Sequence, residues 1–277
     1  MRRSEVIFRR GDILSREMLE ELYRYPREVA ESFFSSYTDG ILYGLSWRGD
    51  GGYIQPGALK FQGRIYYLTN PLDAAERLKD RVRDGEKYRL VFRPEYDSER
   101  AAKDGGENPL RVYSLTLDAF HTERFERERT RIFYYMYAQY GKRDGFIPLD
   151  DPHEVYGLCA ANDGYAFAFS PDFVRRKLLP EIEDKARKHP MDFPLMQTAF
   201  QDERLSVRFI RQYLKEYRLQ TGRSGEISDE LLSDSGKLLD ELMTAIKYLR
   251  FAGSFADPES APSLRKDAAP KREGRML

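Results

Sequence analysis

The sequence is poor in cysteine, has no excess charge of either sign and contains no long apolar run. Cys159 is the one cysteine among 277 residues, which excludes an intramolecular disulfide and fits a reducing compartment. Lys plus Arg and Asp plus Glu both number 46, whereas a nucleic-acid-binding surface usually shows a basic excess. No stretch approaches the ~20 apolar residues that span a bilayer, and the N-terminus MRRSEVIFRRGD lacks a signal-peptide core. We therefore expect a cytoplasmic protein with no membrane partner, and nucleic acid is a disfavoured partner.

Residues of the types that form metal or catalytic sites do not cluster in the sequence. Metal sites need clustered ligands, but the histidines are far apart in the sequence: His121, His153 and His189. The pair Asp150-Asp151 lies between prolines and is better explained as a loop. Cys159, flanked by Leu158 and Ala160, has no visible base partner, so we expect a buried, unreactive thiol. These patterns predict no catalytic residue, no metal site and no cofactor.

One fragment has a distant likeness to a phosphate-binding loop. Ser235-Gly236-Lys237-Leu238 lacks both the hydroxyl residue after the lysine and the upstream glycine that such a loop requires. It also falls inside an amphipathic pattern, so we expect a helix there and no nucleotide.

The composition indicates a folded protein with a polar surface. Hydrophobic residues make up 41% and charged residues 33% of the chain, which is not the balance of a disordered protein. The length corresponds to about two domains. Such a chain buries roughly three quarters of its unfolded surface and needs no disulfide or metal to fold.

The first part of the chain predicts a helix followed by short antiparallel strands. Apolar spacing over 14–37 indicates a helix that Pro26 kinks or divides. The pattern then alternates with a period of two, and Gln62-Gly63 forms a hairpin tip with Leu59, Phe61, Ile65 and Tyr67 on one face. The polar stretch 95–109 reads as an exposed loop. The strand candidates are 41–47, 53–55, 59–67, 88–92 and 113–117.

The second part predicts a hairpin and helices. Alternating aromatic residues after the turn Asn162-Asp163-Gly164 indicate a hairpin over 156–169. Ser170 and Pro171 are favourable residues for starting a helix, which Pro180 interrupts and His189-Pro190 ends. A final helix over 228–251 repeats its apolar residues every seven positions, as in a bundle or short coiled coil.

These elements define an α+β fold. We predict an N-terminal helix plus an antiparallel β-sandwich-like domain, then a β-hairpin and a C-terminal helical bundle. The predicted domains are 1–120, a helix plus antiparallel β docking domain; 121–252, a mixed hairpin and helical domain; and 253–277, a disordered tail.

The segment 124–143 mixes arginines with aromatic residues. Aromatic rings beside cations can bind single-stranded nucleic acid, so a nucleic-acid-associated protein is the alternative function. Interspersed glutamates cancel much of the charge, however. A solvated helix start that leads into a core or interface aromatic cluster is the favoured reading.

The segment Phe8 to Leu68 resembles a known family. It reads FRRGDILSREMLEEL, then DGILYGLSW at 39–47, then YIQPGALKFQGRIYYL at 53–68. This order resembles the attachment domain of phage tail and baseplate fibre-type proteins. It is also similar to the N-terminal part of the baseplate linker component of type VI secretion systems. The matching positions are Gly40, Gly44, Pro56, Gly57 and Gly63.

Those glycines have a physical reason to be glycine. We expect Gly57 and Gly63 to adopt positive φ in tight turns. We expect Gly44, inside a strand, to allow the close approach of another backbone or to mark a bulge.

The resemblance implies a non-enzymatic structural or adaptor subunit of a phage-tail-like or contractile injection particle baseplate. Its partners would be other particle or baseplate proteins. It would also form a homo-oligomer, since the family usually forms trimers with a coiled stalk. The repeat at 231–249 is compatible with a stalk, although one such helix more often packs within its own chain. An enzyme with a site assembled from distant residues is the remaining hypothesis.

Overall fold

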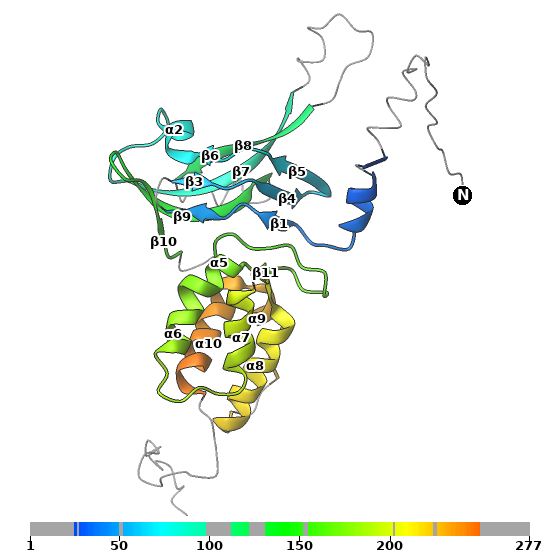
Figure 1. Ribbon diagram of the computed structural model, residues 1–277, viewed down its shortest axis with the longest axis vertical. Coiled ribbons are helices and arrows are strands. Elements are labelled where there is room, and N and C mark those ends of the chain that lie inside the picture. The colour runs from blue at the N-terminus through cyan, green and yellow to red at the C-terminus, as the bar shows by residue number, and fades with distance from the viewer. Residues whose placement is uncertain are drawn as a thin grey trace, which may run out of the picture.

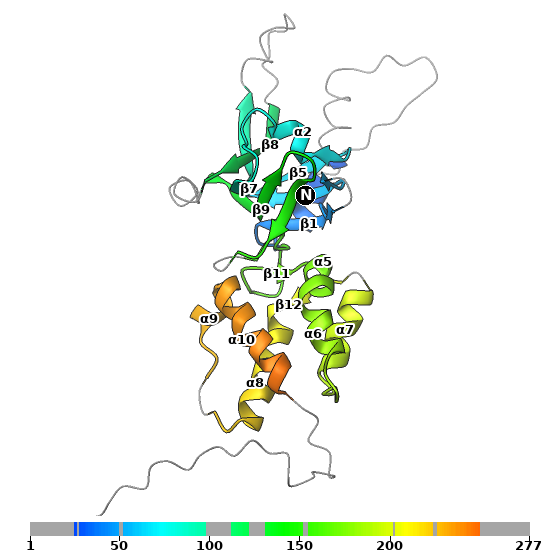
Figure 2. The same cartoon turned by 90° about the vertical axis from the view of Figure 1, so that its left-hand side faces the viewer.

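The computed structural model describes residues 25–26, 28–49, 52–97, 112–121, 131–151, 155–201, 203–223 and 226–249. Strands form one part of the molecule and helices form the other, stacked along the longest axis (Figures 1 and 2). The chain is therefore α+β. The expected helix before residue 25 and the expected tail 253–277 lie outside the described residues.

A three-stranded antiparallel sheet forms one layer of the β part. Its strands, in the order β1-β4-β5, are β1 (Gly40–Gly44), β4 (Gly57–Phe61) and β5 (Arg64–Leu68). Gln62 and Gly63 form the tip between β4 and β5 with φ of 50° and 74°, as a two-residue hairpin turn requires. The predicted hairpin and its tip are confirmed.

The faces of this hairpin differ from the prediction. The two-residue tip pairs Phe61 with Arg64 and Leu59 with Tyr66, so Leu59 and Phe61 share their face with Tyr66. Tyr67 pairs with Ala58 and belongs to the opposite face. Directly paired residues point to the same side of a sheet, and counting across the tip as if the alternation were unbroken placed Tyr67 on the wrong side.

A four-stranded antiparallel sheet forms the second layer. Its strands, in the order β10-β9-β7-β8, are β7 (Lys87–Asp97), β8 (Val112–Phe120), β9 (Phe133–Gly141) and β10 (Gly145–Leu149). β7 includes residues 95–97, where an exposed loop was expected, and residues 98–111 lie outside the described part. Because β9 pairs with β7, this sheet draws strands from both sides of residue 120, where a domain boundary was expected.

A third, smaller sheet and one helix complete the β part. The sheet has the order β2-β3-β6 and consists of β2 (Trp47–Arg48), β3 (Tyr53–Ile54) and β6 (Leu72–Asp73). The helix α2 (Ala74–Leu78) follows at once, and the Asp73 side chain accepts a hydrogen bond from the Glu76 amide at 2.9 Å. An aspartate in this position satisfies one of the free amides at a helix start.

One hydrophobic core lies between these sheets. Leu59 and Tyr66 from the first sheet meet Leu90 and Tyr135 from the second, and Ile54 joins them from the third. Leu90, Tyr135 and Ile54 are fully buried. Burial of each such side chain contributes about 1.5–3 kcal/mol, so this core holds the layers face to face.

The helical part has its own core. Its elements are α5 (Pro171–Phe173), the π-helical turn η2 (Val174–Leu178), α6 (Leu179–Glu183), α7 (Asp192–Phe200), α8 (Val207–Gln220), α9 (Asp229–Ser233) and α10 (Ser235–Tyr248). A short antiparallel pair of strands joins the segment before α5 to the segment before α8: β11 (Ala168–Phe169) and β12 (Leu205–Ser206). Ser170 caps α5, with its side chain accepting from the Phe173 amide at 3.2 Å, and Pro171 follows. The predicted helix start is confirmed.

Two predicted elements of this region differ from the structure. The hairpin over 156–169 reduces to one antiparallel bridge between Cys159 and Ala168, because β11 pairs with β12 instead. The final helix is two helices, since Asp234 ends α9 and caps α10. The helix α7 was not predicted.

The backbone geometry at two glycines of the first sheet leaves no room for a side chain. A Cβ on Gly44 would lie 2.1 Å from the Pro56 carbonyl oxygen, and φ at Gly44 is 62°. A Cβ on Gly57 would lie 2.4 Å from the Tyr43 carbonyl oxygen. The close approach expected at Gly44 is confirmed. Positive φ at Gly57 was wrong, since Gly57 is needed for space and not for backbone conformation.

We predict that Gly44→Ala destabilises the protein more than Gly63→Ala. Gly63 has φ of 74° but an added Cβ would meet nothing within 4 Å, so alanine there costs only the left-handed backbone, about 1–2 kcal/mol. Gly44→Ala adds the collision with Pro56. Urea unfolding followed by circular dichroism measures both losses, and equal losses would show that the β1–β4 approach is not tight.

A second prediction concerns pH. The backbone hydrogen bond from Lys237 (3.0 Å) lowers the pKa of the α10 cap Asp234 below its ordinary value of 3.8. A lowered folded pKa gives stability that is present above the unfolded pKa and lost as pH falls through the folded one. Asp234→Ala should therefore cost about 1 kcal/mol at neutral pH, and this difference from wild type should shrink below about pH 4.

The neutral cap of α9 supplies the control. Ser228 accepts from the Leu231 amide at 3.3 Å and carries no charge, so the cost of Ser228→Ala should stay constant with pH. Thermal unfolding of the three proteins over about pH 3 to 7 measures this. Parallel pH profiles for both variants would contradict a charged cap at Asp234.

Candidate functional site

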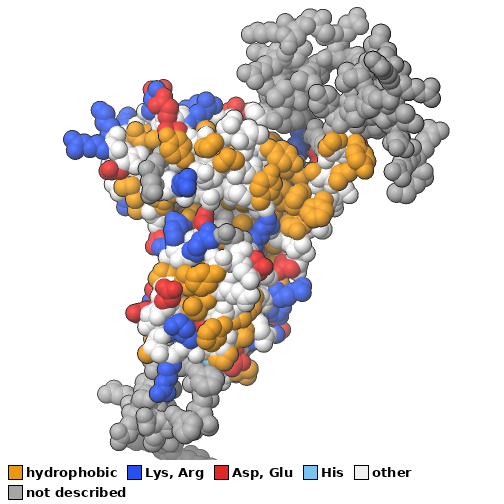
Figure 3. Space-filling model, in the orientation of Figure 1, with side chains coloured by type: hydrophobic (Ala, Val, Ile, Leu, Met, Phe, Trp, Pro, Cys, Tyr) orange, Lys and Arg blue, Asp and Glu red, His pale blue; other side chains and the backbone are white. Residues whose placement is uncertain are grey.

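Large aromatic side chains lie exposed on one side of the β part. Phe33, Tyr43 and Tyr67 are 68%, 55% and 57% exposed, and we call these three residues the aromatic face. Figure 3 shows hydrophobic side chains gathered on this side of the β part. Exposed apolar clusters on a protein surface often mark sites where another protein binds.

The sheet register places two of these rings. Tyr43 of β1 and Tyr67 of β5 both pair with Ala58 of the central strand β4, so the three side chains project from one side of the sheet in one row. Ala58 is 1% exposed. Ala58 is therefore covered within the protein, while the two tyrosines that pair with it stay exposed.

The helix of residues 28–33 supplies the third ring. Phe33 meets Phe34 edge-on with ring centroids 4.9 Å apart, and Phe34 meets Tyr37 at 5.2 Å. Phe34 and Tyr37 in turn pack against Leu42 and Ala58 on the outer side of the sheet. This ladder of rings connects Phe33 to the same side of the β part as Tyr43 and Tyr67.

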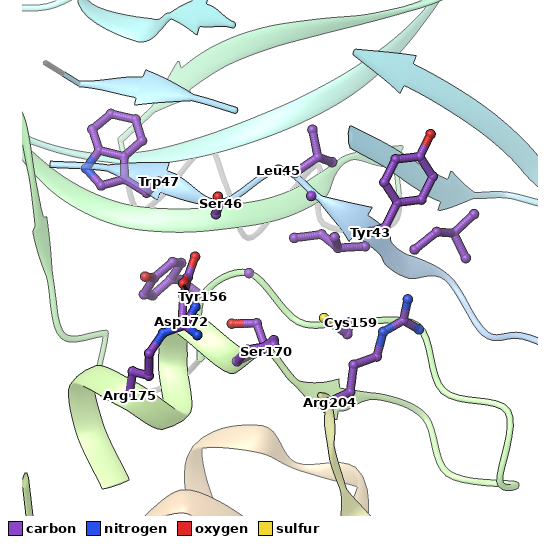
Figure 4. A pocket seen from close by; sticks show the side chains of 15 residues that line it. Tyr43, Leu45, Ser46, Trp47, Tyr156, Cys159, Ser170, Asp172, Arg175 and Arg204 are labelled. Carbon is purple, nitrogen blue, oxygen red and sulfur yellow. Dashed lines mark hydrogen bonds and ion pairs between the residues drawn. The ribbon is translucent and has the colours of Figure 1, made fainter. Parts of the chain in front are cut away.

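A cleft of about 430 Å³ lies where the β part meets the helical part, and Tyr43 of the aromatic face also lines it. In Figure 4, Tyr43 and Trp47 belong to the strand side, while Ser170, Asp172 and Arg175 belong to the helix side. The charged groups already have partners within the protein. Arg175 donates to Asp172 at 2.5 Å and to the Ala199 carbonyl at 3.1 Å. These bonds hold the helical elements that line the cleft in place, which is a structural role.

Cys159 also lines this cleft. It is 4% exposed, and burial raises the pKa of its thiol to about 11. The thiol therefore stays protonated at neutral pH and is a poor nucleophile. The expected buried thiol is confirmed.

The two histidines in the described part lie apart. His121 lies 3.8 Å from the Glu86 carboxylate and beside the Tyr88 ring. His189 is 7% exposed, and its Nδ1 accepts from the Met191 amide at 3.2 Å. His153 lies outside the described residues. Within the described ranges, no group of three or more His, Cys, Asp or Glu side chains could hold a metal ion.

The Asp150-Asp151 pair divides into two structural roles. Asp151 is buried and forms a two-point ion pair with Arg89, with N–O distances of 2.9 and 3.2 Å. It also accepts from the Tyr134 hydroxyl at 3.0 Å. Asp150 pairs with Lys177. The sequence showed the two carboxylates but could not show that Arg89, far along the chain, lies against one of them.

The aromatic part of the segment 124–143 is strand β9. Tyr135 is fully buried and donates to the Leu45 carbonyl at 2.6 Å, and Tyr134 is 9% exposed. The expected core cluster is therefore present, and it lies on a strand. Rings in a core cannot stack on bases, so the structure gives no support to nucleic-acid binding by these tyrosines. Residues 122–130 lie outside the described part.

The remaining sequence motifs are structural too. Ser235 opens α10 and is largely buried, accepting from the Val155 amide at 3.3 Å. The leucines of the seven-residue repeat belong mostly to the helical core: Leu232, Leu238, Leu242 and Leu249 are each at most 2% exposed. They pack within this chain. Where the structure describes helices, none is long and apolar enough to span a bilayer.

Comparison with known proteins gives distant likenesses of fold. No protein-family model and no curated protein matches the chain. A crystal structure of TssK is 11% identical with a TM-score of 0.38, covering 88% of this chain and 68% of that one. A cryo-electron microscopy structure of the type VI secretion system TssK-TssF-TssG baseplate subcomplex contains a chain 10% identical with a TM-score of 0.42, covering 88% of this chain and 99% of that one. A likeness at this level says nothing of activity or partners.

Proposed function

We propose that this chain is a non-enzymatic structural or adaptor subunit of the baseplate of a phage-tail-like or contractile injection particle. It acts by assembling with other particle proteins. The observation that carries the proposal is the aromatic face, on which Phe33, Tyr43 and Tyr67 are each more than half exposed. Tyrosine and phenylalanine are enriched where proteins meet.

The geometry of the aromatic face suits docking. Tyr43 and Tyr67 stand on the two outer strands of one sheet, each paired with β4, so their positions are set before a partner arrives. Rigid aromatic side chains supply a large contact area at a small cost in conformational entropy. A partner segment with apolar side chains would cover the exposed rings of Tyr43 and Tyr67 and remove their apolar area from water.

The choice of particle rests on the sequence resemblance of residues 8–68. Two of the matching glycines of that segment have structural roles that only glycine fills. Gly40 has φ of 151° and an added Cβ would lie 2.4 Å from the Ala160 amide, while Gly44 leaves no room before Pro56. The described part of this segment includes the sheet β1-β4-β5, which carries Tyr43 and Tyr67 of the aromatic face. Partners are proposed to be baseplate proteins.

The test is binding by the aromatic face. Tyr43→Ser and Tyr67→Ser should each weaken binding to the baseplate proteins encoded beside this chain by about tenfold or more, as loss of a central interface ring does. Both side chains are exposed, so the fold should be nearly unaffected. Titration calorimetry with the purified partners measures the affinities.

The helix α7 provides matched controls. Phe193 and Phe200 are 58% and 67% exposed but belong to the helical part. Phe193→Ser and Phe200→Ser should leave the affinity unchanged. If the wild-type chain binds none of the neighbouring baseplate proteins, or if the α7 variants lose as much affinity as the tyrosine variants, the proposal fails.

We also propose that the chain forms a homo-oligomer, with a trimer as the expected stoichiometry. Its formal charge of zero gives little self-repulsion to oppose association. Light scattering at tens of micromolar should report a mass above 32.5 kDa. A strict monomer at that concentration would contradict a stable homo-oligomer.

A further inference from the structure

Lys60 is a buried cation held by backbone carbonyls. It lies on β4 and is 8% exposed. Its ammonium donates to the carbonyls of Phe34, Ser35 and Tyr37 at 2.8, 3.1 and 2.6 Å. These three bonds use all the N–H donors of a lysine. In the described ranges it makes no ion pair with a carboxylate.

The location of Lys60 explains these bonds. The helix of residues 28–33 ends at the turn that carries the three carbonyls, and the last carbonyls of a helix lack partners within it. The C-terminal end of a helix also carries partial negative charge, which a cation offsets. Burial of an unpaired ammonium is costly, so Lys60 is stable in this position only while the turn stays on it.

Lys60 lies beneath the aromatic face. It is two residues from Ala58 on the same strand, so both side chains project from the outer side of the sheet. The turn above Lys60 carries Phe34 and Tyr37, which continue the ring ladder from Phe33. The position of this ladder therefore depends on where the turn sits.

We infer that Lys60 is a positioning residue for the aromatic face: it fixes the end of the 28–33 helix on the sheet so that Phe33 stands beside Tyr43 and Tyr67. This inference rests on the proposed function only where it concerns a partner. The anchoring of the turn is a property of the chain alone.

Bonds further along the chain make the effect local. The Thr38 amide donates to the Ala161 carbonyl at 2.8 Å, and the Ala161 amide donates to the Thr38 hydroxyl at 2.9 Å. These bonds hold the chain where it enters β1 and do not involve Lys60. Loss of the ammonium should therefore release the turn and helix end while β1 stays paired.

Hydrogen exchange on the full chain tests the anchor. Lys60→Met keeps the length and apolar stem of the side chain but removes its donors. The amides of Phe34 and Tyr37, bonded to Ala30 and Phe34 at 3.0 and 3.1 Å, should exchange about tenfold faster or more, as loss of bonds to a charged group implies. Amides of β4 and β5 should be unchanged, which also shows that the variant is folded.

Two further variants sharpen the result. Lys60→Arg keeps the charge and N–H donors, so exchange at Phe34 and Tyr37 should slow again relative to Lys60→Met. Lys79→Met removes an exposed lysine that pairs with Glu76 at 2.6 Å and should match wild type. Unchanged exchange at Phe34 and Tyr37 in Lys60→Met would overturn the inference.

Binding separates this inference from the proposed function. If Lys60 positions the aromatic face, Lys60→Met should weaken binding to the baseplate partner at least several-fold while the amides of β4 and β5 stay protected from exchange. Faster exchange with full affinity would show that the turn is anchored but does not position the face, which overturns the inference. Absence of binding by the wild-type chain counts against the proposed function, while the exchange result still decides the anchor.

Discussion

Strand β1 is held between two backbones, and the rest of the molecule is arranged around that contact. On one edge β1 pairs with β4, so closely that Gly44 and Gly57 have no space for a side chain. On the other edge, the Ile41 amide donates to the Leu158 carbonyl and the Ala160 amide to the Ile41 carbonyl, both at 3.0 Å. Residues 158–160 precede the helices in the chain. Strand β1 therefore bonds both to its own sheet and to the segment that leads into the helical part.

This arrangement separates the residues that hold the fold from those that face outward. The buried face of β4 and β5 contributes Leu59 and Tyr66 to the core, whereas the outer face carries Ala58 and Tyr67. Apolar area left in water is unfavourable by about 25 cal/mol per Å². An exposed ring on a rigid sheet is thus a cost that contact with another protein would remove, and the same alternation that builds the core creates this surface.

Much of the local structure could be predicted from the sequence, but β9 could not. The hairpin tip at Gln62-Gly63 and the helix start at Ser170 have short-range causes that residue types reveal. In β9 the residues 134–136 are all buried, because the register shifts opposite Leu90 and Val91. A bulge of this kind destroys the period of two on which strand prediction depends. The heptad spacing likewise continued through Asp234, since a one-residue break between two helices barely disturbs the repeat.

The aromatic face was missed for a related reason. Tyr67 was expected on the same face as Leu59 and Phe61 because alternation was carried across the hairpin tip, and only the pairing of Phe61 with Arg64 shows that the faces exchange. Nothing in the sequence around Lys60 distinguishes it from a surface lysine. Its role depends on a helix end more than twenty residues earlier in the chain, which no local pattern contains.

The buried thiol has a practical consequence. Cys159 is the single cysteine of the chain, and it bridges to both Ile41 and Ala168, at the place where the strand and helix parts meet. A thiol-specific reagent can modify the chain only at Cys159, and only while that joint is open. The rate of thiol labelling therefore measures how often this joint opens. The native sequence allows this measurement without an engineered probe.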